Sequence, residues 1–155
     1  MINIYDKIIM NIEEIKEWLP HRSPLLLIDS VNQLSIGETI VTSKLLTPAE
    51  PVFEGHFPKN PIYPGVYYIE AIAQSGALLS SLSLFKKETK KTELGVLTSI
   101  EEARFRRPGL PGEKVYYEVS IEKMRGSFVW FKGTASINNE VAAQCKLSIS
   151  ITSKR

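Results

Sequence analysis

The sequence predicts an α+β domain in which one long antiparallel sheet wraps around a central apolar helix. From Gly65 onward, apolar residues recur at helical spacing, whereas three later segments alternate apolar and polar residues as half-buried strands do. An antiparallel sheet with one wet face buries its other face against a helix. The 155 residues fit a single domain of ordinary size, so we expect residues 1–155 to fold as one unit.

Three elements are predicted before the central helix. A short amphipathic pattern that stops at Pro20 favours a helix, because proline cannot continue one. Two strand-like runs separated by a turn at Ile36-Gly37 favour a pair of strands. These elements are a helix over 10–19, within an N-terminal helical segment 1–20, and strands over 25–34 and 38–46.

Four strands are predicted after the central helix. The last three alternate clearly, and turn-forming residues at Arg125-Gly126 and Asn138-Asn139 separate them, which indicates an antiparallel meander. A polar linker over 86–93 leads from the helix into the first of the four. The predicted strands cover residues 94–100, 114–124, 128–137 and 140–152.

The composition is that of a soluble globular protein, with 43% apolar and 23% charged residues. The first residues mix charged with apolar side chains, unlike a signal peptide, so a cytosolic, cytoplasmic location is expected. The central helix carries Glu70, Gln74 and four serines, which favours a core helix over a membrane span. Basic clusters in the C-terminal part come without a nucleic-acid-binding motif, which favours an acidic protein partner over a nucleic acid.

Cys145 is the only cysteine of the chain. A lone cysteine excludes an internal disulfide and a cysteine-based metal site, and no metal is expected. Cys145 falls on the apolar face of its predicted strand, so a buried and unreactive thiol is expected.

A histidine and a glutamate stand fourteen positions apart in the most informative stretch, residues 55–74. His56 lies in a loop that three prolines stiffen, because proline fixes φ and removes a backbone donor. Glu70 lies inside the apolar helix, where a carboxylate is disfavoured unless it is paired or used. The two residues are therefore candidates for an acid/base pair.

Four segments of the chain resemble the FabZ family of (3R)-hydroxyacyl-acyl-carrier-protein dehydratases, and the resemblance runs from about Leu19 to Ser150. The most specific is GHFPKNPIYPGVYYIEAIAQ at 55–74, in which the histidine, the prolines and the glutamate fall at the family spacing. Glu70, instead of aspartate, favours FabZ over the related dehydratase-isomerases. The other segments are LPHRSPLLLID at 19–29, ARFRRPGLPGEKV at 103–115 and FKGTASINNEVAAQCKL at 131–147. The resemblance implies a hot-dog fold, a sheet wrapped around a central helix.

The resemblance also implies roles for individual residues. His56 is the expected base that removes a proton from C2 of the substrate, and Glu70 is expected to protonate or orient the leaving C3 hydroxyl. Gly65, at the start of the central helix, is expected to offer a backbone N–H to the thioester oxygen. Gln74 lies one turn beyond Glu70, where it either holds the glutamate or has a structural role.

The resemblance further implies that the substrate arrives on the phosphopantetheine arm of acyl carrier protein and that no other cofactor is needed. In the family, the histidine and glutamate of one site come from different subunits of a homodimer, and trimers of dimers are common. The candidate docking residues for the carrier are Arg104, Arg106, Arg107 and Lys132. Strand alternation places the first two on one face and Arg107 on the other, and a lysine cluster at 86–91 is the alternative surface.

The sequence leaves open alternative functions and the pathway of the chain. A hot-dog acyl thioesterase and a non-catalytic hot-dog subunit that binds an acyl carrier are the alternatives to a dehydratase. Ser23, Tyr67 and Tyr68 depart from the family pattern, which leaves both housekeeping fatty-acid synthesis and a specialised polyketide or polyene pathway open. His21 lies outside the catalytic segment and is expected to be a turn or packing residue.

Overall fold

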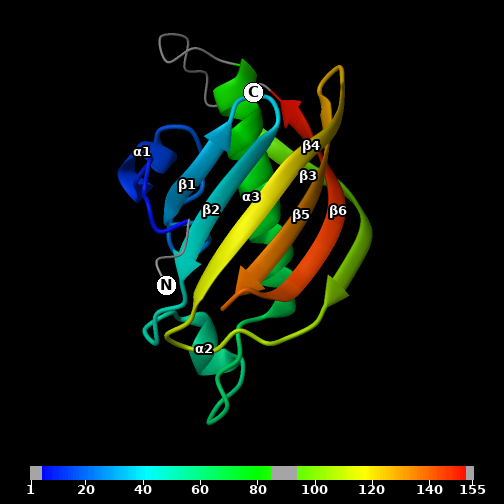
Figure 1. Cartoon of the computed structure of the whole chain (residues 1–155). Helices are drawn as coiled ribbons and strands as arrows, with labels where there is room; N and C mark the ends of the chain where they lie inside the picture. The colour runs from blue at the N-terminus through cyan, green and yellow to red at the C-terminus, as the bar shows by residue number, and fades with distance from the viewer. Residues whose placement is uncertain (1–4, 85–93, 153–155) are drawn as a thin grey trace.

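A six-stranded antiparallel sheet curls around one long helix in the computed structural model, which describes residues 5–84 and 94–152 (Figure 1). The strands run in the spatial order β1-β2-β4-β5-β6-β3. This arrangement confirms the predicted fold class. The helices are α1 (Ile12–Lys16), α2 (Val52–Gly55) and α3 (Gly65–Leu84), and the strands are β1 (Ser30–Ser35), β2 (Thr39–Leu45), β3 (Leu94–Phe105), β4 (Lys114–Arg125), β5 (Phe128–Ile137) and β6 (Glu140–Thr152).

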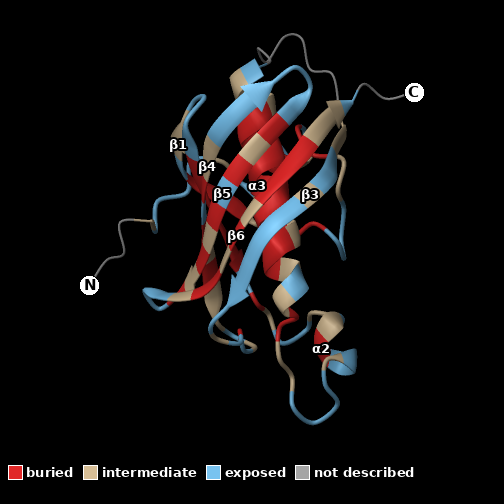
Figure 2. Cartoon of the chain, turned by 90° about the vertical axis from the view of Figure 1, so that its right-hand side faces the viewer, coloured by how far each residue is buried: buried red, intermediate tan, exposed pale blue. Residues whose placement is uncertain are grey.

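Helix α3 lies against the concave face of the sheet and is buried along most of its length (Figure 2). Small residues let the two layers approach closely: a Cβ at Gly133 would collide with Ile72, and one at Gly76 would lie 3.0 Å from the ring of Phe131. No helix among the described residues is long and apolar enough to cross a membrane.

Two predicted elements begin or end elsewhere in the structure. The strand expected from residue 25 begins at Ser30, because the Leu27 N–H donates to the side chain of Gln74 while Leu25 and Leu26 donate to the Arg22 carbonyl. The helix expected over 10–19 is shorter: Asn11 caps its first turn, and α1 ends at Lys16, after which the Glu17 and Trp18 N–H groups donate to carbonyls three residues back. Both predictions were wrong at their boundaries since side-chain contacts, and not local periodicity, decide where the backbone donors go.

Two further differences concern the segments on either side of α3. The strand expected over 94–100 continues to Phe105, because β6 pairs with it as far as Phe105 opposite Ala143. The short helix α2 was not predicted. It precedes the histidine loop, and His56 is the residue that ends it. The linker over 86–93 lies outside the described residues.

Strand β3 forms one edge of the sheet and is exposed along much of its length (Figure 2). Its exposed side chains include Val96, Ile100 and Phe105, each about half accessible to solvent. A long edge strand with apolar side chains offers unpaired backbone groups to another strand, and proteins usually cover such an edge. Within the described residues, no further strand pairs with β3 beyond β6.

Candidate active site

The ring of His56 is held by the loop that follows it. Its Nδ1 lies 2.6 Å from the carbonyl oxygen of Ile62, while the Ile62 N–H donates to the His56 carbonyl at 2.8 Å. A carbonyl oxygen only accepts, so Nδ1 carries the hydrogen and Nε2 presents a lone pair. The ring of Phe57 stacks on the imidazole with a centroid separation of 4.0 Å. The Ile62 carbonyl and the Phe57 ring thus fix the orientation of the His56 imidazole.

Glu70 is held by Gln74 one turn further along α3. The Gln74 Nε2 donates to Glu70 Oε1 at 2.8 Å and to the Leu25 carbonyl at 2.7 Å. The Gln74 Oε1 accepts from the Leu27 N–H at 2.9 Å. Because two backbone groups fix the amide, only an N–H can face the carboxylate. Of the two roles left open by the sequence, the structure shows contact with the glutamate, and the amide also anchors residues 25–27.

A second residue reaches the same carboxylate. His21, expected to be a turn or packing residue, has its Nε2 3.5 Å from Glu70 Oε1. The sequence did not predict this contact, because His21 precedes Glu70 by 49 positions. Only the fold brings the two side chains together.

Gly65, the first residue of α3, lines a pocket that also includes His56. The pocket has a volume of about 320 Å³ and includes Tyr63, Tyr68 and Phe105 in its wall. A Cβ at Gly65 would lie 2.9 Å from the ring of Phe105, so a side chain there would have to displace that half-exposed ring. The first N–H groups of a helix lack intrahelical acceptors, which leaves them available to an oxygen atom in the pocket.

The two tyrosines that depart from the family pattern have different surroundings. Tyr68 is 1% exposed and packs on Tyr63 at a centroid distance of 5.3 Å, in the wall of the pocket beside His56. Burial raises the pKa of Tyr68 to about 12, and the phenol therefore stays neutral. Tyr67 meets Tyr63 edge to face at 5.5 Å. Tyr68 is thus the departure that reaches the pocket.

No hydrogen bond or ion pair joins His56 to Glu70 among the described residues. Glu70 also does not line the pocket that His56 shares with Gly65. Within the described part of one chain, the candidate base and the candidate acid therefore do not form a hydrogen-bonded pair.

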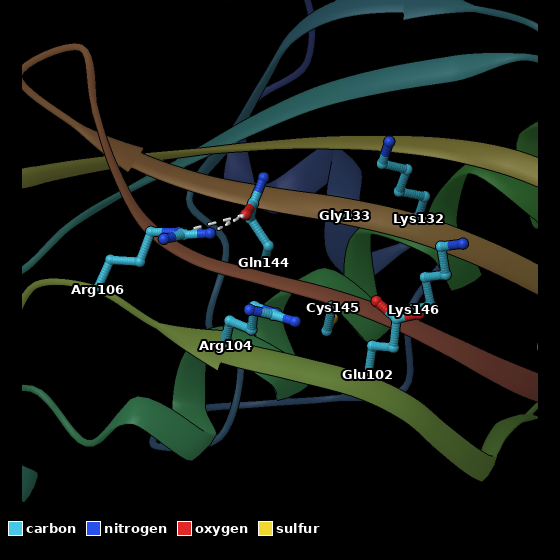
Figure 3. Close-up of a pocket in the computed structure, with 8 residues that line it drawn as sticks. All are labelled: Glu102, Arg104, Arg106, Lys132, Gly133, Gln144, Cys145 and Lys146. Carbon is cyan, nitrogen blue, oxygen red and sulfur yellow. Dashed lines mark hydrogen bonds between the residues drawn. The ribbon is translucent and has the colours of Figure 1, made fainter.

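Three of the four predicted docking residues lie together on the sheet. Arg104, Arg106 and Lys132 line a pocket of about 200 Å³ that also includes Gln144 and Lys146 (Figure 3). Arg106 donates to the Gln144 Oε1 at 3.3 Å and 3.4 Å. We call Arg104, Arg106, Lys132 and Lys146 the basic patch.

Arg107, like Arg106, lies beyond the last residue of β3, so strand alternation does not decide the direction of its side chain. Its guanidinium pairs with Glu113 at 2.7 Å and with Glu140 at 3.5 Å, and it borders the pocket beside His56. Those carboxylates neutralise its charge. The alternative lysine surface at 86–91 lies outside the described residues.

Cys145 is buried, and burial raises its pKa to about 12, so the thiol is unreactive at neutral pH as expected. The described residues contain no group of three or more His, Cys, Asp or Glu side chains that would bind a metal ion.

Comparison with known proteins places this chain in a family. The family model described as a FabA-like domain matches residues 19–146. Among solved structures, the dehydratase heterocomplex ApeI:P from Xenorhabdus doucetiae aligns with a TM-score of 0.78 at 19% identity, covering 90% of this chain and 91% of that one. A thioesterase superfamily member from Thermus thermophilus aligns with a TM-score of 0.61 at 22% identity, covering 79% and 86%. These neighbours confirm the hot-dog fold.

Curated relatives identify the family within this fold. A protein of Helicobacter acinonychis is 41% identical over 145 residues, covering 92% of both chains, and one of Nitratiruptor is 40% identical, covering 94% of this chain and 99% of its own. A Campylobacter jejuni relative is 38% identical over 94% of this chain and 99% of its own. All three bear the name 3-hydroxyacyl-[acyl-carrier-protein] dehydratase FabZ. The chain belongs to this FabZ family of dehydratases, as its four segments indicated.

Proposed function

We propose that this chain removes water from a (3R)-3-hydroxyacyl thioester carried on acyl carrier protein and releases the trans-2-enoyl thioester. The observation that carries the proposal is the orientation of His56. Its Nδ1 hydrogen is committed to the Ile62 carbonyl, so Nε2 is free to accept a proton in a pocket that also contains the start of α3.

The proposed reaction uses one proton acceptor and one proton donor. The His56 Nε2 takes a proton from C2, which the thioester carbonyl acidifies, and the electron pair left on C2 forms the C2–C3 double bond as the C3–O bond breaks. Glu70 supplies a proton to the departing hydroxyl, directly or through a water molecule, so water leaves. The Gly65 N–H stabilises the negative charge on the thioester oxygen. No cofactor besides the phosphopantetheine arm takes part.

A product assay separates this proposal from its alternatives. The pure protein is incubated with a 3-hydroxyacyl thioester while enoyl absorbance and free thiol are followed together. Enoyl product without thiol is expected. Release of thiol would indicate a thioesterase, and absence of both products would indicate a binding subunit.

We further propose a homodimer in which each site takes His56 from one chain and Glu70 from the other. Two observations support it: the two residues do not contact each other within the described part of a chain, and the exposed apolar edge of β3 is suited to pairing with a second β3. Assembly of dimers into trimers of dimers belongs to the same proposal.

Subunit mixing tests the shared site. When His56→Ala and Glu70→Gln proteins exchange subunits, each heterodimer gains one site with both groups and one site with neither. We expect activity to recover to about a quarter of the wild-type value, since half of the dimers would be heterodimers with one working site each. Steady-state dehydration before and after exchange measures it. Verified exchange without recovery would show that each chain contains its own complete site.

We propose that the basic patch docks the carrier protein. On the sheet, Lys132 stands directly opposite Lys146, and Arg104 stands opposite Gln144. Like charges directly opposite each other destabilise a sheet, and Glu102, which stands opposite Lys146 on β3, offsets only part of this positive charge, so the patch favours an anionic partner. Within the described residues, no carboxylate forms an ion pair with these three cations.

Charge reversal tests the patch. The Lys132→Glu variant should lower kcat/KM roughly tenfold for carrier-bound substrate while barely altering a small thioester, because only the carrier brings an acidic surface. Added salt should reduce the difference by screening exposed charges. Arg106→Glu should also slow the reaction with carrier-bound substrate, but Arg106 lines the pocket beside His56 as well, so Lys132→Glu is the variant that tests docking alone. Arg125→Glu, at the end of β4, is the matched control. An equal loss on both substrates would mean that the patch supports the fold or the active site.

A further inference from the structure

His21 approaches the candidate acid, and the reaction as proposed gives it no part. Its Nε2 lies 3.5 Å from Glu70 Oε1, the oxygen that also accepts from Gln74 at 2.8 Å. Two side chains from opposite directions along the chain thus converge on one carboxylate oxygen. Within the described residues, Glu70 Oε2 has no hydrogen-bond partner.

The backbone that carries His21 is fixed by its neighbour. The Arg22 guanidinium donates to the carbonyls of Leu19, His21 and Lys16 at 2.8, 2.7 and 3.1 Å. The Arg22 carbonyl in turn accepts from the N–H groups of Leu25 and Leu26. This network closes residues 16–26 into a turn, so His21 is held beside α3 independently of its contact with Glu70.

The surroundings of the ring favour a neutral imidazole that donates from Nε2. The Nδ1 atom is buried and has no partner among the described residues, so a second ring hydrogen would lack an acceptor. Burial lowers the pKa of His21 and Arg22 lowers it further, against the opposing effect of the Glu70 carboxylate. With its one hydrogen on Nε2, the ring can donate only from the nitrogen that lies 3.5 Å from Glu70 Oε1, a separation longer than an ordinary hydrogen bond.

We propose that His21 is a positioning residue: with Gln74, it holds one oxygen of Glu70 and thereby presents the other oxygen to the substrate. The inference rests on the proposed function, because it assumes that Glu70 acts on the leaving hydroxyl. His21 exchanges no proton with the substrate. Its effect is to confine the rotation of a carboxylate whose side chain is 31% exposed, for which a single hydrogen bond from Gln74 leaves rotational freedom.

Three substitutions separate positioning from packing. His21→Phe keeps a flat ring but removes the donor, His21→Asn is polar but too short to reach Glu70, and His21→Gln places an amide N–H near the position of Nε2. We expect kcat to fall about tenfold in the Phe and Asn variants, the scale of one hydrogen bond, with KM within about twofold. The Gln variant should keep at least about half of the wild-type kcat.

Thermal unfolding and oligomeric state are measured for each variant. If the Phe variant does not fold, the Asn variant still tests the inference. Equal kcat losses in folded Gln and Asn variants, or an unchanged kcat in the Asn variant, would overturn the inference. The Glu70→Gln protein distinguishes this failure from that of the proposed function. Inactive Glu70→Gln together with fully active His21→Asn refutes only the role of His21, whereas active Glu70→Gln refutes the role of Glu70 itself.

Discussion

The His56→Ala protein is expected to lose at least ~100-fold in kcat, the usual scale for one general acid/base group, while keeping its fold. The reason lies in the tautomer. The Ile62 carbonyl commits the Nδ1 hydrogen, so Nε2 is the basic atom that the ring presents, and alanine supplies no replacement. Steady-state formation of the enoyl product measures the effect.

The matched control for this variant is Glu54→Ala. Glu54 is an exposed residue of the same α2 segment, and its substitution should leave kcat within about twofold of the wild-type value. Unchanged thermal unfolding of both variants would show that the loss is chemical. Retention of more than about a tenth of the activity by His56→Ala would contradict the assignment of the base.

The Glu70→Gln protein is expected to show a similar collapse, of ~100-fold or more in kcat. Glutamine keeps the size of the side chain, and its oxygen still accepts from the Gln74 amide, but it has no proton to give to a leaving hydroxyl. The same enoyl assay measures the loss.

A glutamate on the exposed part of β4 provides the control for Glu70. Glu122→Gln makes the same chemical change away from the pocket and should be neutral. Normal dehydration by the Glu70→Gln protein would assign Glu70 a structural role, and the acid would then have to be sought among other groups of the assembled site.

Local periodicity predicted the second half of the fold well. The strands expected over 128–137 and 140–152 have those bounds in the structure, because strict alternation fixes which face of each strand is buried. These features depend on residues close together in the sequence, so a single sequence is enough to predict them.

Contacts between residues far apart in the sequence could not be predicted from local periodicity. The stretch 25–28 has the composition of a strand, but Gln74, 47 positions from Leu27, takes the Leu27 N–H. The approach of His21 to Glu70 and the addition of Lys146 to the basic patch also depend on the tertiary fold. For the candidate site, the sequence indicated which groups are chemically suited to the reaction, and their hydrogen-bond partners came from the structure.

Pairing of two chains through the exposed edge of β3 makes the activity of this protein depend on protein concentration. In the proposed dimer, the backbone groups of that edge and half of each catalytic set become complete only when a second chain binds. Mass action then makes specific activity a function of dilution, with a fall below the dissociation constant of the dimer. Substitutions at the exposed Val96 or Ile100 would reduce turnover by lowering the fraction of paired chains.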